Sequence, residues 1–412
     1  MFRPHCLSSI AERCPPVFHI PGEALAFPSG LASPDAERLI YKALKRAGRR
    51  NFSDLSFVRP LNLLLKAYAE EADLSTFGRC AFRGDVQRCL NNLLRLDIAE
   101  EEYPAIRDRP IRSPVFITGM PRSATSFLHQ VLSLDPANAV PRCWQLIYPY
   151  PLRSRLLSFD PRKALVDLEL RLFRCMTPGV GELHDLSADE PQECTDITAQ
   201  VFQSLRFEST HHIPSYQAWI DRHGHRDAFL FHRRFLQHLD AQMPGRRWVL
   251  KSPDHVFALD AIRSVYPDAK IVFLHRDPLS VIPSCVKLTE RLHRPFTNHL
   301  DTHQLGQQVS ARLNQAADHM MAAANRLPDI LHLYYREVVA QPMEAVQTLY
   351  RHCGMALNGV AEQRMTNFLA RPRRRSTPRY DFAMFGLDAG KLRERFSAYV
   401  RHFAVPMDAL SG

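Results

Sequence analysis

An arginine and several hydroxyl side chains stand within one short stretch of the chain, PVFITGMPRSATSFL (114–128). The apolar run at 115–118 predicts a buried parallel strand. Gly119 and Pro121 are expected to turn the chain, and a helix is expected to begin near Ala124. A strand, a glycine-containing turn and a helix form a cradle in which backbone N–H groups and the helix dipole face an anion. The stretch therefore predicts an anion-binding loop.

This loop lacks the lysine of the loops that bind ATP and GTP, which read G-x-x-x-x-G-K-[ST]. The lysine position holds Thr125, and the basic residue stands three positions earlier, at Arg122. Ser123 and Ser126 add two hydroxyls. The ligand of this loop therefore needs a cation within the loop and hydroxyls at the start of the helix.

Two further cations follow predicted strands. Arg276 directly follows the apolar run of KIVFLHRDP, and Ser284 lies eight residues further on, in the next helix. Lys251 ends the run RRWVLKSP. Ligands of parallel α/β sheets bind beyond the carboxyl ends of the strands, so we expect these cations and Arg122 at one sheet edge. An arginine and a hydroxyl can bind one tetrahedral anion. The alternative for Arg276 alone is an ion pair with Asp277 or another surface acid.

The order of apolar runs predicts an α/β fold with a P-loop-like parallel sheet flanked by helices. A further strand is expected in DILHLYYREVV (329–339), and segments with helical spacing fill the intervals between the strands. Apolar residues at helical spacing before the first strand predict helices packed on the core. The predicted organisation is an irregular extension at 1–36, an N-terminal helical segment at 37–110 and an α/β domain at 111–405.

The composition narrows the class of protein. With 412 residues, 45% apolar and 23% charged, the chain resembles ordinary soluble globular proteins. The net charge of +10 indicates an anionic partner, which can be nucleic acid, a membrane surface or a polyphosphorylated cofactor. No transmembrane run and no signal-peptide pattern is visible, so a cytoplasmic location is expected. The nine cysteines lack metal-ligand spacing, which predicts reduced thiols and no metal.

Together, the two anion-binding stretches resemble the sulfotransferase family. TGMPRSATSFL is similar to the family's loop for the 5′-phosphosulfate of 3′-phosphoadenosine 5′-phosphosulfate (PAPS), and FLHRDPLSVIPSCVKL is similar to its 3′-phosphate motif. LKSPDHVFALDAIRSVYPDAK, CWQLIYPYP, SADEPQEC and RYDFAMFGLDAGKLRERFSAYVRHF also resemble the large, mainly bacterial branch of that family. Because PAPS has no β- and γ-phosphates, the missing lysine of the ATP-binding loops agrees with this resemblance.

The resemblance implies roles for individual residues. The following are implied to bind the 5′-phosphosulfate: Gly119, Pro121, Arg122, Ser123, Ala124, Thr125 and Ser126. Arg276 and Ser284 are implied to bind the 3′-phosphate, and Lys251 lies near the transferred group. Arg379 and Tyr380, with the basic run at 371–375, are implied to form a flap near the nucleotide. The alternatives are a structural ion pair for Lys251, and a solvated loop or nucleic-acid patch for the basic run.

Two positions depart from the family pattern. Family loops usually carry glycine at Ala124, and alanine fits there only if the residue does not need a positive φ. Relatives of this branch often read Trp-Glu where this chain has Trp144-Gln145, and glutamine cannot accept a proton at neutral pH. The general base is therefore expected in ELHDLSADEPQEC, where Glu193 matches the branch's recurring acid and His184 has a suitable unperturbed pKa.

These features predict a PAPS-dependent sulfotransferase that moves the sulfuryl group in line to an acceptor hydroxyl and releases adenosine 3′,5′-bisphosphate. Arg122 would stabilise charge on the leaving oxygen, and Lys251, Glu193 or His184 would complete the catalytic group. The alternatives are a P-loop kinase-like nucleotide enzyme and a catalytically impaired nucleotide-binding protein. The expected acceptor is a small-molecule or lipid hydroxyl compound rather than nucleic acid. The oligomeric state is not predicted.

Overall fold

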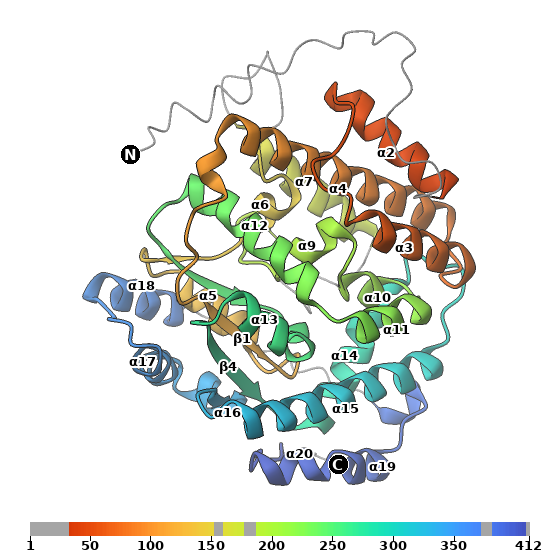
Figure 1. The fold of residues 1–412 in the computed structure, drawn as a ribbon. Coiled ribbons are helices and arrows are strands. Elements are labelled where there is room, and N and C mark those ends of the chain that lie inside the picture. The colour runs from red at the N-terminus through yellow and green to blue at the C-terminus, as the bar shows by residue number, and fades with distance from the viewer. Residues whose placement is uncertain (1–32, 152–159, 177–186, 372–380, 409–412) are drawn as a thin grey trace.

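The computed structural model describes residues 33–151, 160–176, 187–371 and 381–408 (Figure 1). Within these residues the strands form one five-stranded parallel sheet in the order β2-β3-β1-β4-β5. The strands are β1 Val115–Gly119, β2 Asn138–Ala139, β3 Arg247–Lys251, β4 Lys270–His275 and β5 Leu331–Tyr334. Helices flank the sheet, so the predicted α/β fold is confirmed.

The sheet register aligns the carboxyl ends of the three central strands. All five residues of β1 are buried, as expected for a central strand that is covered on both faces. Ile117 in β1 pairs with Lys251 in β3, and Gly119 pairs with Leu274 in β4. The loops that follow these strands therefore leave the sheet at the same edge.

Two strands differ from the sequence-based expectation. The run at 329–339 is a strand only as far as Tyr334, and α16 (Tyr335–Ala340) follows it directly. The reason is that β5 pairs only with β4, which ends at His275, the partner of Tyr334. Strand β2 was not predicted, because its two residues are held by pairing with β3 and do not form an apolar run of their own.

Helices of both halves of the chain cover the sheet. The helices that precede β1 are α2 Pro34–Ala47, α3 Val58–Glu70 and α4 Thr76–Glu102, with the 3₁₀ turn η1 Pro104–Ile106. The α-helices after β1 are α5 Thr125–Leu132, α6 Cys143–Ile147, α7 Arg162–Met176, α9 Thr195–Thr198, α10 Arg206–Thr210, α11 Pro214–His223, α12 Arg226–Gln242, α13 Leu259–Val265, α14 Pro278–His293, α15 Thr302–Arg326, α16, α17 Pro342–His352, α18 Gly359–Leu369, α19 Ala389–Arg395 and α20 Ser397–His402. Further 3₁₀ turns are η2 Ala199–Val201, η3 Pro253–Phe257 and η4 Phe382–Phe385.

The alternating side chains of the strands divide the core into two layers. Phe116 and Phe273 share one apolar cluster with α4, α12 and α13, so the N-terminal helices pack on the core as predicted (Figure 1). Ile117 and Val272 point to the other face, where α5, α17 and α18 cover them. The division of the chain at 36 and 110 stays a prediction. No helix within the described ranges combines the length and apolar character needed to span a bilayer.

A buried carboxylate connects α4 to α12. One oxygen of Glu100 lies 2.8 Å from Nε2 of His238 and 2.6 Å from Nε of Arg234. Arg107 donates to the other oxygen at 2.8 Å. Burial alone would raise the pKa of Glu100, but the hydrogen bonds from His238 and Arg234 outweigh it and lower that pKa to about 2. Glu100 is therefore ionised, and its charge holds the N-terminal helices on the core.

We predict that Glu100→Gln lowers the free energy of unfolding at pH 7 by about 2 kcal/mol, because the hydrogen bonds from Arg234 and Arg107 lose their charged acceptor. The folded-state pKa lies below the unfolded one, so this stabilisation is complete above about pH 4.5 and is lost as the pH falls towards 2. Urea unfolding at pH 7 and pH 3.5 measures the difference. The exposed Glu102→Gln serves as control. An equal loss at both pH values would contradict an electrostatic role.

Candidate active site

The loop between β1 and α5 has an unusual backbone. Gly119 (φ 125°), Arg122 (φ 61°) and Ala124 (φ 67°) all have positive φ. At Gly119 a Cβ atom would lie 2.3 Å from the carbonyl oxygen of Leu274, so no larger residue fits. Positive φ on both sides of Ser123 turns successive N–H groups towards one concave surface, and the start of α5 adds its own. The loop therefore has the form of an anion cradle.

Ala124 occupies the position where the family usually has glycine. Its φ and ψ of 67° and 19° place it in the left-handed region, directly before α5. The loop requires a positive φ at this position, and the Cβ atom of alanine makes that conformation unfavourable. The strain amounts to about 1–2 kcal/mol.

We predict that Ala124→Gly raises the free energy of unfolding by about 1 kcal/mol, because glycine adopts this conformation without strain. The matched control is Ala322→Gly, at an exposed position inside α15, which should lower the free energy of unfolding by about 1 kcal/mol. Thermal and denaturant unfolding of both variants give the comparison. A loss at both positions would show that the loop does not strain Ala124.

The structure brings the two predicted anion-binding stretches together. Nε of Arg122 donates to Oγ of Ser284 at 3.2 Å. Nη1 of Arg276 donates to the backbone oxygen of Arg122 at 2.7 Å. Asp277 does not pair with Arg276; its carboxylate accepts from the N–H of Leu279 at the start of α14. The loop, the end of β4 and helix α14 thus form one continuous site.

Sequence reasoning missed the other neighbours of Arg276. Nε of Arg276 lies 3.4 Å from Oδ2 of Asp408, and its guanidinium lies 3.8 Å from the ring centre of Tyr335. Arg336 contacts the second oxygen of the same carboxylate at 3.1 Å. The alternative of a pair with another acid therefore holds for Arg276, with a partner 132 residues away. The predicted strand at 329–339 included Arg336, so its place beyond the end of β5 was not visible from the sequence.

Lys251 connects the end of β3 to the loop. Its Nζ is buried and lies 3.0 Å from Oγ of Ser126 and 2.5 Å from Oε1 of Glu193. Lys251 is therefore part of an ion pair, as one alternative held, and this pair also lies against the first turn of α5. The structure in this way brings Glu193 beside the hydroxyl groups of the loop.

A second carboxylate near Lys251 was not singled out from the sequence. Burial, with the neighbouring Glu193 carboxylate, raises the pKa of Asp254 to about 6. Its place in LKSPDH, three residues after Lys251, was the available signal. His255 is different: it is buried against Phe116, and neither ring nitrogen has a hydrogen-bond partner in the described part of the chain. Burial lowers the pKa of His255 well below its usual value, so it is a neutral core residue.

Gln145 has a structural role. Its Oε1 accepts from the N–H of Arg142 at 3.0 Å, which closes the start of α6, and its Nε2 lies 3.6 Å from Sδ of Met243. His184, Arg379 and Tyr380 lie outside the described residues, as does the basic run beyond residue 371. Their assignments stay predictions.

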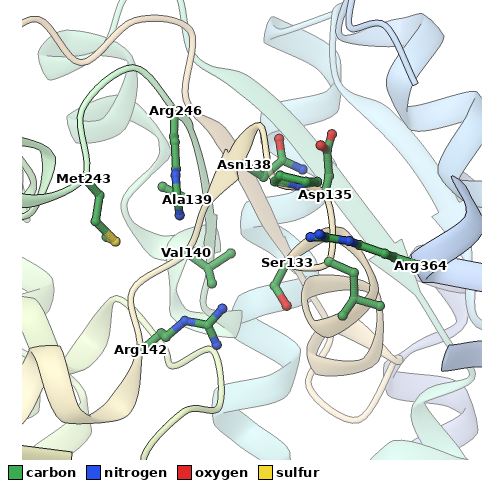
Figure 2. Close-up of a pocket in the computed structure, with 11 residues that line it drawn as sticks. Ser133, Asp135, Asn138, Ala139, Val140, Arg142, Met243, Arg246 and Arg364 are labelled. Carbon is green, nitrogen blue, oxygen red and sulfur yellow. The ribbon is translucent and has the colours of Figure 1, made fainter. Parts of the chain in front are cut away.

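A cavity of ≈ 180 Å³ lies at the opposite end of α5 from the loop (Figure 2). Its lining contains none of the predicted site residues, and it includes Arg142, Arg246 and Arg364. Figure 2 shows Ser133 between Arg142 and Arg364 in this view. The lining also contains Asp135, so the cavity combines three arginines with one carboxylate and is separate from the loop.

The fold and the loop together define the class of protein. A match to the sulfotransferase family covers residues 114–359, which is more than half of the sequence. The chain belongs to the sulfotransferase family, and the resemblance predicted from the sequence is confirmed.

Individual relatives agree with this assignment. The omega-hydroxy-beta-dihydromenaquinone-9 sulfotransferases Stf3 of Mycobacterium bovis and Mycobacterium tuberculosis are each 23% identical over 252 residues. That match covers 59% of this chain and only 63% of the relatives' length. Among solved structures, sulfotransferase STF1 of Mycobacterium tuberculosis H37Rv has a TM-score of 0.77 and 30% identity, over 89% of this chain and 99% of that one. Sulfotransferase STF9 of Mycobacterium avium has a TM-score of 0.81 and 26% identity, over 92% and 99%.

Proposed function

We propose that the protein is a PAPS-dependent sulfotransferase that transfers a sulfuryl group to an acceptor hydroxyl. The observation that carries this proposal is the contact of Arg122 with both Ser284 and Arg276. These residues come from the loop and from the strand end that suit the two ends of one nucleotide. Family membership supports the same reaction.

The described residues suit PAPS as the donor. The N–H groups of the loop, with the hydroxyls of Ser123, Thr125 and Ser126, would hold the 5′-phosphosulfate. Arg276 and Ser284 would hold the 3′-phosphate. The family resemblance implies that Arg379 and Tyr380, which are outside the described residues, also lie near the nucleotide. A kinase-like reaction fits less well, because Thr125 stands where ATP-binding loops carry their lysine.

The residues around Lys251 suit in-line transfer. As the acceptor oxygen forms its bond to sulfur, the bond between sulfur and the bridging oxygen breaks, and adenosine 3′,5′-bisphosphate leaves. Arg122 stabilises the charge that grows on that oxygen but cannot donate a proton. Glu193 takes the acceptor's proton, and Lys251 holds Glu193 against the loop. A metal is not part of this proposal.

The acceptor we propose is a lipid or another small apolar hydroxyl compound. The Stf3 relatives are sulfotransferases named for an omega-hydroxy dihydromenaquinone, which is such a compound. Helix α7 offers apolar surface near the segment that carries Glu193: Leu168, Leu172 and Met176 are exposed. The N–H of Ala188, in that segment, donates to Asp167 of the same helix. The cytoplasmic location and the absence of a nucleic-acid partner stay predictions.

We predict that Arg276→Ala weakens binding of adenosine 3′,5′-bisphosphate by about 10- to 100-fold, because a charged hydrogen bond to the 3′-phosphate is lost. Adenosine 5′-phosphate, which lacks that group, should bind almost as before. Calorimetry with both nucleotides measures the difference, with the exposed Arg351→Ala as control. Stabilisation of the wild-type protein by Mg-ATP, but not by adenosine 3′,5′-bisphosphate, would favour the kinase-like alternative and contradict the proposal.

We predict that Glu193→Gln lowers kcat by about 100-fold or more, because the acceptor's proton loses its base. The matched variant is Asp254→Asn, which should keep most of the rate. The pKa of Asp254 is about 6, so an Asp254 base would make the rates of wild-type and Asp254→Asn proteins converge below pH 6, where both side chains are neutral, and diverge above it. With Glu193 as the base, the two rates should stay similar across this range. Sulfuryl transfer from labelled PAPS to an acceptor found by screening measures both. Loss of transfer in Asp254→Asn, with transfer kept in Glu193→Gln, would make Asp254 the base.

A further inference from the structure

Asp408 lies between two arginines at the carboxyl end of the sheet. Its Oδ2 is 3.4 Å from Nε of Arg276, and its Oδ1 is 3.1 Å from Nε of Arg336. The side chains of Arg276, Arg336 and Asp408 are 15%, 50% and 23% exposed, so solvent reaches the group. Each oxygen of one carboxylate thus faces a different guanidinium, and the position between the two arginines suits an anion.

The sheet register explains why two arginines meet here. His275 at the end of β4 pairs with Tyr334 at the end of β5. Arg276 is the residue after the first of these partners, and Arg336 is two residues after the second. Tyr335, between Tyr334 and Arg336, places its ring against Arg276. Both cations therefore belong to the edge of the sheet where the nucleotide is proposed to bind.

The segment that carries Asp408 is attached by a few polar contacts. The N–H of Asp408 donates to Oδ2 of Asp277 at 3.0 Å, and Arg336 donates to the carbonyl oxygen of Met407. Further back, the hydroxyl of Tyr334 donates to the carbonyl oxygen of Phe403 at 2.8 Å. The segment is fixed as far as Val405, which is buried in the core, and beyond it Asp408 is held mainly by charge and by two hydrogen bonds that water can replace.

We propose that Arg336 is a second arginine of the 3′-phosphate site, and that Asp408 occupies this site until the nucleotide displaces it. This inference rests on the proposed function. A phosphate monoester carries more charge than a carboxylate and offers three oxygens, so it competes well for two guanidinium groups. In part of the free molecules Asp408 occupies the 3′-phosphate site. The apparent affinity for the nucleotide is therefore lowered in proportion to the fraction of molecules in which this site is open.

Substitutions of Arg336 and of Asp408 should change the affinity for the nucleotide in opposite directions. Arg336→Ala should weaken the binding of adenosine 3′,5′-bisphosphate by about tenfold, because a partly exposed charged contact to the phosphate is lost. Asp408→Asn should instead strengthen the binding of the same nucleotide by about threefold, because the competing charge is gone. Adenosine 5′-phosphate should bind equally to all three proteins. The measurement is isothermal titration calorimetry on the full chain with these two nucleotides, and it needs no acceptor.

Matched controls remove one charge elsewhere. Arg351→Ala, exposed on α17, and Asp260→Asn, exposed and paired with Arg326, should leave both affinities unchanged. Weaker binding in Asp408→Asn would mean that Asp408 only orients Arg276, and it would overturn the competition. Unchanged binding in Arg336→Ala, with weaker binding in Arg276→Ala, would overturn the role of Arg336 and leave the proposed function intact. A wild-type protein that does not bind the bisphosphate would overturn both.

Discussion

The close approach of Gly119 to the backbone of Leu274 is the constraint on which the site depends. β1 and β4 are adjacent parallel strands, and any side chain at position 119 would collide with the carbonyl oxygen of Leu274. Because the loop leaves β1 against β4, the backbone oxygen of Arg122 lies within hydrogen-bond distance of Arg276. The same path lets the side chain of Arg122 reach Ser284 on α14. Separating these two strands at this edge would therefore separate the loop from the second half of the proposed nucleotide site.

The central strands could be predicted from the sequence because they are buried on both faces and read as continuous apolar runs. The loop and the Arg276–Ser284 spacing are equally local signals. The end of β5 was not visible in its own residues, since it is set by where β4 stops at His275. The positive φ of Ala124 depends on how the loop packs, so only the condition under which alanine would be strained could be predicted. Asp408 lies 132 residues from Arg276, and no local pattern could connect them.

Charge balance shapes the rest of the site. Lys251, Arg122 and Arg276 follow three neighbouring strands, and like charges at one edge repel one another. The structure compensates two of them with carboxylates from distant segments: Glu193 for Lys251 and Asp408 for Arg276. The two pairs differ in burial. Lys251 is buried and lies close to the Glu193 carboxylate, so this pair is a fixed part of the site. Arg276 and Asp408 are reached by solvent, and their charged atoms lie farther apart.

This difference in burial has a consequence for the proposed reaction. Contacts that bind donor and product equally do not speed the chemical step, and they slow the release of adenosine 3′,5′-bisphosphate. The 3′-phosphate is present in both nucleotides, so its contacts are of this kind. A carboxylate that competes for Arg276 and Arg336 would weaken the binding of donor and product alike, and would therefore favour release of the product nucleotide. The role proposed for Arg122 is different, because its partner would be charge that grows on the bridging oxygen during transfer. The proposed competition by Asp408 would therefore lower affinity at one end of the nucleotide without lowering transition-state stabilisation at the other.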